Sequence, residues 1–441
     1  LPSFIMNALS SFMVTFVNLF LVAYSDTAIA FFGAYFKVQQ LIVMTVNGLI
    51  QGCLPVMRFN YGAGSSERLH SAFRYGTALV TGMMILGTLA VILFPAQILG
   101  LFTASEAMRS FGISAMRIMA TSYLFCGLST MISTYFQATE KVGSSMAIQL
   151  CRQLLFLVPS LWCLDKLFHL NGIWLAFPVA ETGTLLVALI GWPGITVKNH
   201  NVFCEGGIMN DTFMKEKPVL PLILSMSLPM VLSMLVNSLY NIVDSFFVGK
   251  YSESALTALS VIYPLQLIII ALAVGTGVGV NTYMARLYAQ KMPGQAEETA
   301  GTGTLLALGT WFIFAIFSIF CMRPYVLTSA NTPEAIESAV IYGQIVCIGS
   351  IGAFLEGNWT KVPSVAGQYA PSDGRPDRGA LTNIVLDPIL IFGLGPVPEL
   401  GVAGAAYATV CGQVAACGRS HRLAGLAELP ERIKNAALYQ A

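Results

Sequence analysis

The chain has 441 residues, of which 56% are hydrophobic and only 10% are charged, and its net charge is +1. A soluble protein carries about 25% charged residues, so this composition excludes an ordinary soluble domain and predicts a protein dissolved mainly in lipid. The near-neutral balance gives no reason to expect a nucleic-acid partner. The nine cysteines are expected to serve as small apolar residues rather than to form disulfides.

Long apolar stretches recur along the chain at the length that a membrane-spanning helix needs, about 20 residues. They lie at roughly 2–23, 33–56, 76–101, 112–137, 145–164 and 171–193, and then at roughly 219–249, 255–285, 300–325, 338–355, 380–395 and 400–417. None shows the alternating pattern of a membrane β-barrel, so helices are the expected form. The sequence predicts an all-α integral membrane protein with about twelve transmembrane helices.

The second set of stretches is a copy of the first. A shift of 227 residues places "YSDTA" (24–28) on "YSESA" (251–255) and Gln39 on Gln266. Such a repeat predicts two six-helix lobes, and an even number of spans per copy makes the repeats parallel in the membrane. The predicted domains are a lobe at 1–197, a cytoplasmic linker at 198–218, a lobe at 219–417 and a divergent tail at 418–441.

The distribution of Lys and Arg predicts the orientation. With Leu1 in the cytoplasm, about 16 of the 23 basic residues fall in cytoplasmic loops or the tail, and about five, Lys37 among them, in the opposite loops. We therefore expect a multi-pass protein of the cell (inner or plasma) membrane with both termini cytoplasmic. The start at Leu1, without the features of a signal peptide, indicates a truncated chain.

Two tracts interrupt the repeat. Residues 356–378 are rich in Gly, Pro and charge where the first copy continues as an apolar helix, and the chain turns polar again after Cys417. Our hypothesis is that both tracts are out of frame or otherwise non-homologous. The alternative is a genuine polar loop and tail, and resequencing the DNA across both junctions separates the two.

Three carboxylates lie inside predicted spans, at Glu181, Asp244 and Asp387. A charge at the bilayer centre costs about 2.5–3.5 kcal/mol on insertion scales, so such residues usually face a cavity and bind ions, protons or substrate. The alternatives are a residue that snorkels from a helix end and a carboxyl that stays protonated. The first copy has Val17 and Val158 at the positions of Asp244 and Asp387, which places the predicted chemistry in the second copy.

Asp387 has neighbours suited to cation or proton binding. Asn383 lies four residues earlier and shares its helix face, and Pro388 disrupts the helix and frees carbonyl groups. Thr409 in the last span and Asn241 beside Asp244 could add oxygen ligands. Ordinary interhelical hydrogen bonding is the alternative role for these polar residues.

No motif indicates an enzyme or a cofactor site. The sequence contains no HExxH, no GxSxG and no Cys/His pair with ligand spacing. The glycines of "NGLIQG" (47–52) and "VGTGVG" (274–279) are not followed by the Lys of a phosphate loop, and their spacing is typical of close helix packing. We expect a non-enzymatic protein without a cofactor.

Several motifs resemble the multidrug and toxic compound extrusion (MATE) family of transporters. Its first, second, fifth and sixth helices resemble "SLPMVLSMLVNSLYNIVDSFFVGKYSESALTALSVIYPLQ" (227–266), "GALTNIVLDPILIFGLG" (379–395) and "GVAGAAYATVCGQ" (401–413). Its second half resembles "NGLIQGCLPVMRFNYGAG" (47–64), "YFQATEK" (135–141) and "GIWLAFPVAE" (172–181). The resemblance implies that the two halves stand in swapped order, with the C-terminal-like half first.

The resemblance implies a secondary active exporter of small amphiphilic or cationic drug-like compounds, driven by Na+ or H+ through alternating access. It implies a monomer in membrane lipid whose coupling site, with Na+ as one candidate ion, is formed by Asp244, Asn383, Asp387 and Thr409. Asn241, Glu181 and Gln266 form a secondary set. Pro229 and Pro388 are expected to bend their helices.

Two alternatives remain open. A lipid-linked glycan flippase on a related fold would need several buried basic residues, whereas only Arg117 and Arg152 fall within predicted spans. A non-functional composite chain would show no transport after reconstitution in liposomes.

Overall fold

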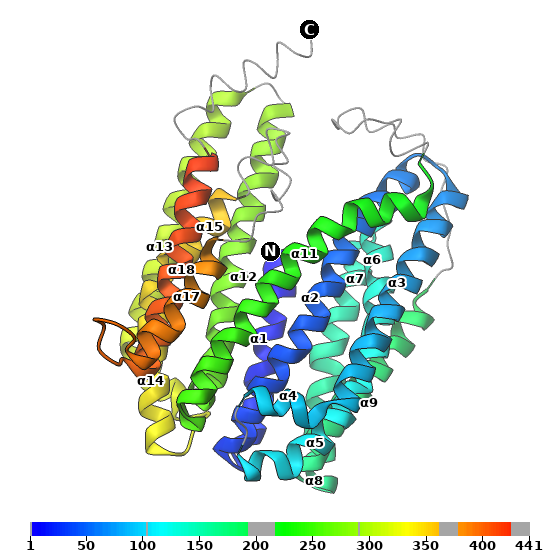
Figure 1. Cartoon of the computed structure of the whole chain (residues 1–441). Helices are drawn as coiled ribbons and strands as arrows, with labels where there is room; N and C mark the ends of the chain where they lie inside the picture. Colours follow the sequence, from blue (N-terminus) through cyan, green and yellow to red (C-terminus); the bar gives the residue numbers. More distant parts are fainter. Residues whose placement is uncertain (1, 103–104, 193–216, 290–291, 361–377, 425–441) are drawn as a thin grey trace. The chain divides into compact units, whose positions relative to one another are not determined.

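A computed structural model describes residues 2–102, 105–192, 217–289, 292–360 and 378–424, which form helices joined by short turns and contain no strand (Figure 1). The helices of the first repeat are α1 (Pro2–Leu21), α2 (Asp26–Gly62), α3 (Ser66–Leu93), α4 (Pro95–Leu101), α5 (Glu106–Ala120), α6 (Ser122–Ala138), α7 (Val142–Leu150), the π-helix η1 (Cys151–Leu157), α8 (Val158–Phe168) and α9 (Leu170–Ile190). Those of the second are α11 (Val219–Tyr251), α12 (Glu253–Ala289), α13 (Pro293–Val326), α14 (Pro333–Gly349), α15 (Ile351–Trp359), α17 (Arg378–Phe392) and α18 (Gly401–Ala424).

Each predicted apolar stretch coincides with one of these helices or with consecutive helices. In the parts of the chain that the structure describes, eight helices are long and apolar enough to cross a membrane, or nine if the bent pair α14 and α15 is one span. The segments Ala8–Leu21 and Gly379–Phe392 are shorter apolar helices. The predicted all-α membrane fold is confirmed.

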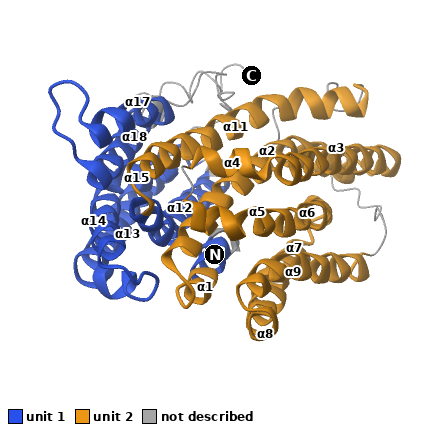
Figure 2. Ribbon diagram, turned by 60° about the horizontal axis from the view of Figure 1, so that its bottom comes forward, with its two compact units in different colours: residues 1–15, 254–441 blue, residues 16–253 orange. Residues whose placement is uncertain are grey.

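The helices form two compact units, drawn in different colours in Figure 2. Unit 1 comprises residues 1–15 and 254–441, and unit 2 comprises residues 16–253. The units differ from the halves of the repeat in where the first helix of each half belongs. Helix α11 opens the second repeat but packs in unit 2, and the start of α1 belongs to unit 1, where the Ser11 hydroxyl donates to the Pro264 carbonyl at 2.6 Å.

In unit 2, the small residues of α2 allow α11 to approach closely. A β-carbon added at Gly48 would lie 2.7 Å from the Val231 Cα, and one added at Gly52 would lie 2.6 Å from the Ser227 Cα. The Ser227 hydroxyl donates to the Leu49 carbonyl at 3.1 Å across the same contact. The packing role predicted for the glycines of 47–52 is confirmed. It is wrong for Gly279, where an added β-carbon would have no atom within 4 Å.

Aromatic side chains fill the core of unit 2. Phe31 of α2 meets Trp174 of α9 edge-on, with ring centroids 5.2 Å apart, and Phe111 of α5 packs on both rings. A second cluster joins Phe73, Tyr135 and Trp192 at centroid separations of 4.6 to 5.5 Å. Each such pair adds about 0.5–1.5 kcal/mol beyond the area it buries.

In unit 1, α18 is a central helix packed against α14, α15 and α17. Glycines permit these contacts too, since a β-carbon at Gly352 would lie 2.9 Å from the Gln413 backbone and one at Gly404 would meet the Leu390 carbonyl group. The Tyr325 hydroxyl donates to the Val261 carbonyl at 2.9 Å and ties α13 to α12. The close packing of α17 on α18 positions the polar residues discussed below.

The tracts that interrupt the repeat lie mostly outside the described residues, namely 361–377 and 425–441. Four residues of the first tract do not fit the expected interruption, because α15 continues to Trp359. Asn358 is buried, and the Trp359 Nε1–H donates to the Thr304 hydroxyl at 3.1 Å. The helix therefore outlasts the predicted span by a turn. Residues 193–216, which hold most of the predicted linker, are also outside the described residues.

Candidate functional site

Asn383, Asp387 and Thr409 form a polar cluster inside unit 1. The first two lie four residues apart on one face of α17, and Thr409 faces them from α18. Asp387 is fully buried and Asn383 is 3% exposed. The carboxamide of Asn383 satisfies both of its ends when its NH2 donates to Asp387 Oδ2 at 3.0 Å and its oxygen accepts from the Thr409 backbone N–H at 3.2 Å. The structure therefore brings three of the four predicted coupling residues together.

Pro388 follows Asp387 directly and alters the hydrogen bonding of the same helix. It lies inside α17. Because proline has no N–H, the carbonyl of Ile384 loses the donor that a helix would otherwise supply. The Asp387 carboxylate and the Thr409 hydroxyl, both within hydrogen-bond distance of Asn383, offer oxygen atoms of the kind that hard cations prefer. The same carboxylate can also exchange a proton.

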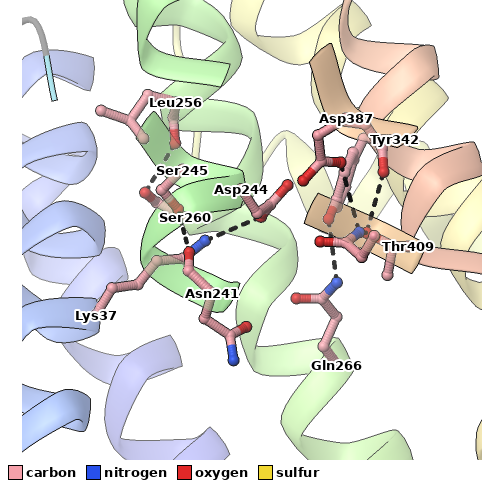
Figure 3. Close-up of polar contacts among 12 residues, drawn as sticks. Lys37, Asn241, Asp244, Ser245, Leu256, Ser260, Gln266, Tyr342, Asp387 and Thr409 are labelled. Carbon is pink, nitrogen blue, oxygen red and sulfur yellow. Dashed lines mark hydrogen bonds and ion pairs between the residues drawn. The ribbon is translucent and has the colours of Figure 1, made fainter. Parts of the chain in front are cut away.

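Gln266 and Tyr342 form a second contact in unit 1. The Gln266 Nε2 on α12 donates to the Tyr342 hydroxyl on α14 at 3.2 Å. Figure 3 draws both side chains next to Asp387 and Thr409 in its view. Tyr342 is 1% exposed and was not predicted from the sequence, because a lone tyrosine in the run "AVIYGQ" has no feature that separates it from a core residue.

Asp244 lies in unit 2 and has a cationic partner that the sequence analysis missed. The Lys37 ammonium of α2 lies 3.3 Å from Asp244 Oδ2 on α11, and the two side chains are 9% and 8% exposed (Figure 3). The prediction that Lys37 lies in an external loop is wrong, because α2 begins at Asp26 and Lys37 is part of that helix. A signal was present, since Lys37 is the only charged residue between Asp26 and Arg58.

The neighbours of Asp244 on α11 bond within their own helix. The NH2 group of Asn241 donates to the Asn237 carbonyl at 2.8 Å, and the Ser245 hydroxyl donates to the Asn241 carbonyl at 3.1 Å. Asn241 therefore contributes no hydrogen bond to Asp244 here. Pro229 lies inside α11, about three turns before these residues, where it removes one helical hydrogen bond.

Glu181 also lies in an ion pair of unit 2, and this pair is largely but not fully buried. Its Oε2 atom on α9 is 3.4 Å from the Nε of Arg152, and the side chains are 15% and 12% exposed. Arg152 lies on η1 and donates from one terminal nitrogen to the hydroxyls of Ser129 at 2.7 Å and Thr130 at 3.2 Å. A π-turn rotates the side chains that follow it, which is why such turns often occur where a polar group must be aimed.

The fold and these polar clusters define a polytopic membrane protein. The sequence model of MatE matches residues 2–162 and 229–372, together more than half of the chain. The chain belongs to the multidrug and toxic compound extrusion family.

Named relatives share parts of the chain. A protein of Shewanella oneidensis named FAD transporter is 31% identical over 211 residues, covering 44% of this chain and 43% of that protein. Multidrug export protein MepA of Staphylococcus aureus (strain MRSA252) is 26% identical over 190 residues, covering 43% and 42%. The chain thus spans less than half the length of these curated relatives.

Solved structures match over nearly the whole chain. An inward-facing multidrug resistance MATE family transporter of the MOP superfamily has a TM-score of 0.68 at 12% identity, covering 95% of this chain and 96% of that one. The eukaryotic MATE transporter AtDTX14 has a TM-score of 0.66 at 16% identity, covering 98% and 96%. The lipid II flippase MurJ has a TM-score of 0.70 at 13% identity, covering 95% and 85%. At these identities the likeness shows the fold.

Proposed function

We propose that the protein is a secondary active exporter of amphiphilic organic cations, driven by inward movement of Na+ or H+. The observation that carries the proposal is the cluster of Asn383, Asp387 and Thr409. A carboxylate that is 0% exposed inside a membrane helix is retained where it binds an ion, a proton or a substrate. The similarity to a protein named multidrug export protein supports the substrate class.

The cluster can couple two fluxes through one carboxylate. In one conformation Asp387 holds the driving cation or proton, with Asn383 bonded to it. In the other conformation the cation leaves and the charge of Asp387 becomes available to favour a cationic substrate. Drug and driving ion then compete for the same negative charge. Each binds better in a different conformation, and alternating access requires this difference in affinity.

The test is substrate efflux with an isosteric replacement. Asp387→Asn removes the charge and keeps the volume, so we expect efflux of a cationic dye from reconstituted liposomes to fall to the level of protein-free liposomes. Asp165→Asn is the matched control, because Asp165 on α8 bonds to Tyr24 and takes no part in the cluster. Imposing a Na+ gradient or a pH gradient in separate experiments identifies the driving ion. Full efflux by a folded Asp387→Asn protein contradicts the proposal.

A lipid-linked glycan flippase is the second candidate, because MurJ shares the fold. A flippase for a polyanionic lipid needs positive charge that is free to meet phosphate groups. In unit 2, Lys37 is buried and Arg152 is largely buried, but Asp244 and Glu181 neutralise them. We therefore favour the exporter. Including a fluorescent lipid-linked glycan and FAD among the transported probes tests both anionic classes in the same liposomes.

A further inference from the structure

Lys37 is a buried cation inside a membrane helix, about three turns from its start. It is the twelfth residue of α2, and Tyr35, Phe36 and Val38 around it are buried as well. A lysine near a helix end can extend its ammonium to the membrane surface, but this lysine is directed to Asp244 inside unit 2. An intramembrane lysine is expected to have such a partner and to have a functional role.

The Asp244 carboxylate is only half satisfied by this contact. Its Oδ2 atom accepts from Lys37, whereas Oδ1 is buried and has no hydrogen-bond partner in the residues that the structure describes. The polar groups nearest along α11, Asn241 and Ser245, bond within their own helix. A competing cation therefore has to replace a single interaction, the 3.3 Å contact between Asp244 Oδ2 and the Nζ of the flexible Lys37 side chain.

We propose that Lys37 is a tethered counter-cation that occupies Asp244 in this conformation, and that the cationic group of a transported organic ion reaches Asp244 only by displacing it. The inference rests on the proposed exporter function and specifies its substrate contact. An ammonium on a four-carbon stem can swing away without a backbone change. When it returns, it neutralises Asp244 and expels the bound cation, which lets one carboxylate both capture the substrate and release it.

The arrangement predicts opposite effects for two substitutions of Lys37. Lys37→Met removes the competitor, so the affinity for tetraphenylphosphonium should rise by about tenfold or more if the displaced state is at most one tenth populated in the wild type. Lys37→Arg strengthens the competitor, because a guanidinium holds a carboxylate with two parallel N–H groups. The affinity of the Lys37→Arg protein for tetraphenylphosphonium should fall.

The experiment measures equilibrium binding of tetraphenylphosphonium to the purified full-length chain in detergent, at alkaline pH to keep the carboxylates ionised. Lys250→Met is the control, because it removes an exposed lysine from the end of α11, the helix that carries Asp244. Adding Asp244→Asn to Lys37→Met should cancel the gain in affinity, since both partners of the competition are then gone.

Unchanged or weaker binding by a folded Lys37→Met protein overturns the inference. If that variant does not fold, Lys37→Arg decides, and unchanged or tighter binding by it overturns the inference equally. Binding needs no transport, so this outcome is independent of the Asp387→Asn efflux test. Absent efflux by the wild type would contradict the exporter proposal. The binding measurements on the Lys37 variants decide this inference separately.

Discussion

Replacing Gly52 by alanine should separate α2 from α11. The added methyl group would lie 2.6 Å from both the Cα and the backbone N of Ser227, and even closer to the Ser227 hydroxyl oxygen. A carbon–carbon contact is favourable at about 3.5–4.0 Å, so the shortfall is about 1 Å. The neighbour is backbone, which cannot rotate away as a side chain can. The helices must therefore move apart, and the Ser227 to Leu49 hydrogen bond across the contact is lost.

Overpacking of this kind costs about 1–3 kcal/mol, and a backbone neighbour places Gly52→Ala near the upper limit. For a body the size of unit 2, that corresponds to a fall in melting temperature of about 6–12 °C. The assay is thermal unfolding in detergent, followed by the recovery of monodisperse protein on size exclusion.

Gly62→Ala is the matched control for this prediction. Gly62 ends the same helix, and a β-carbon added there would have no atom within 4 Å. This variant should therefore melt at or slightly above the wild-type temperature, because alanine favours a helix by up to about 1 kcal/mol. A Gly52→Ala protein that melts with the wild type would refute the close approach of α2 and α11.

Two further predictions concern ion pairs and hydrogen bonds of unit 2. Arg152→Met should lower the free energy of unfolding by about 3 kcal/mol, the lower end of the range for breaking a buried pair, because it leaves the largely buried Glu181 without its cation. Combining it with Glu181→Met should recover most of the loss, and equal losses for the single and double variants in a denaturation series would contradict this. Tyr24→Phe should lower stability by less than about 1 kcal/mol, because the 2.6 Å bond from its hydroxyl to Asp165 is exposed. Partial burial and the Asp165 carboxylate raise the Tyr24 pKa to about 12. The stabilising effect of the hydrogen bond is therefore present below about pH 10 and is lost as the pH rises through about 12. An ultraviolet titration in which every tyrosine ionises near its usual pKa would contradict this.

Asn383 and Asp387 show how far local sequence rules reach in a membrane helix. Helical periodicity alone placed them on one face, four residues apart, and the structure has them in contact. Thr409 was a candidate oxygen ligand from the sequence and was assigned to the same site by the family resemblance, and α18 does present it to Asn383. These inferences succeeded because the length and hydropathy of a span fix a helix, and a helix fixes which residues share a face.

Asp244 shows where the rules end. Its position inside a span was evident, and its functional role stays a prediction. Its partner is more than two hundred residues earlier in the chain, and no local pattern links the two. Counting basic residues for the orientation assigned Lys37 to a loop, because it lies near the start of the apolar stretch at 33–56 and nothing in that stretch reveals its acidic partner.

The sequence by itself determined that the protein lies in lipid, where its helices and internal repeat are, and which carboxylates lie inside spans. Each of these follows from hydropathy and from the spacing of residues along the chain. The tertiary structure decided which charges meet. It paired Asp244 with Lys37 and Glu181 with Arg152, and it brought the amide of Asn383 to Asp387. The physical reason is that a buried charge is stabilised by whatever partner lies within a few ångströms, and that distance is set by helix packing and not by separation in the sequence.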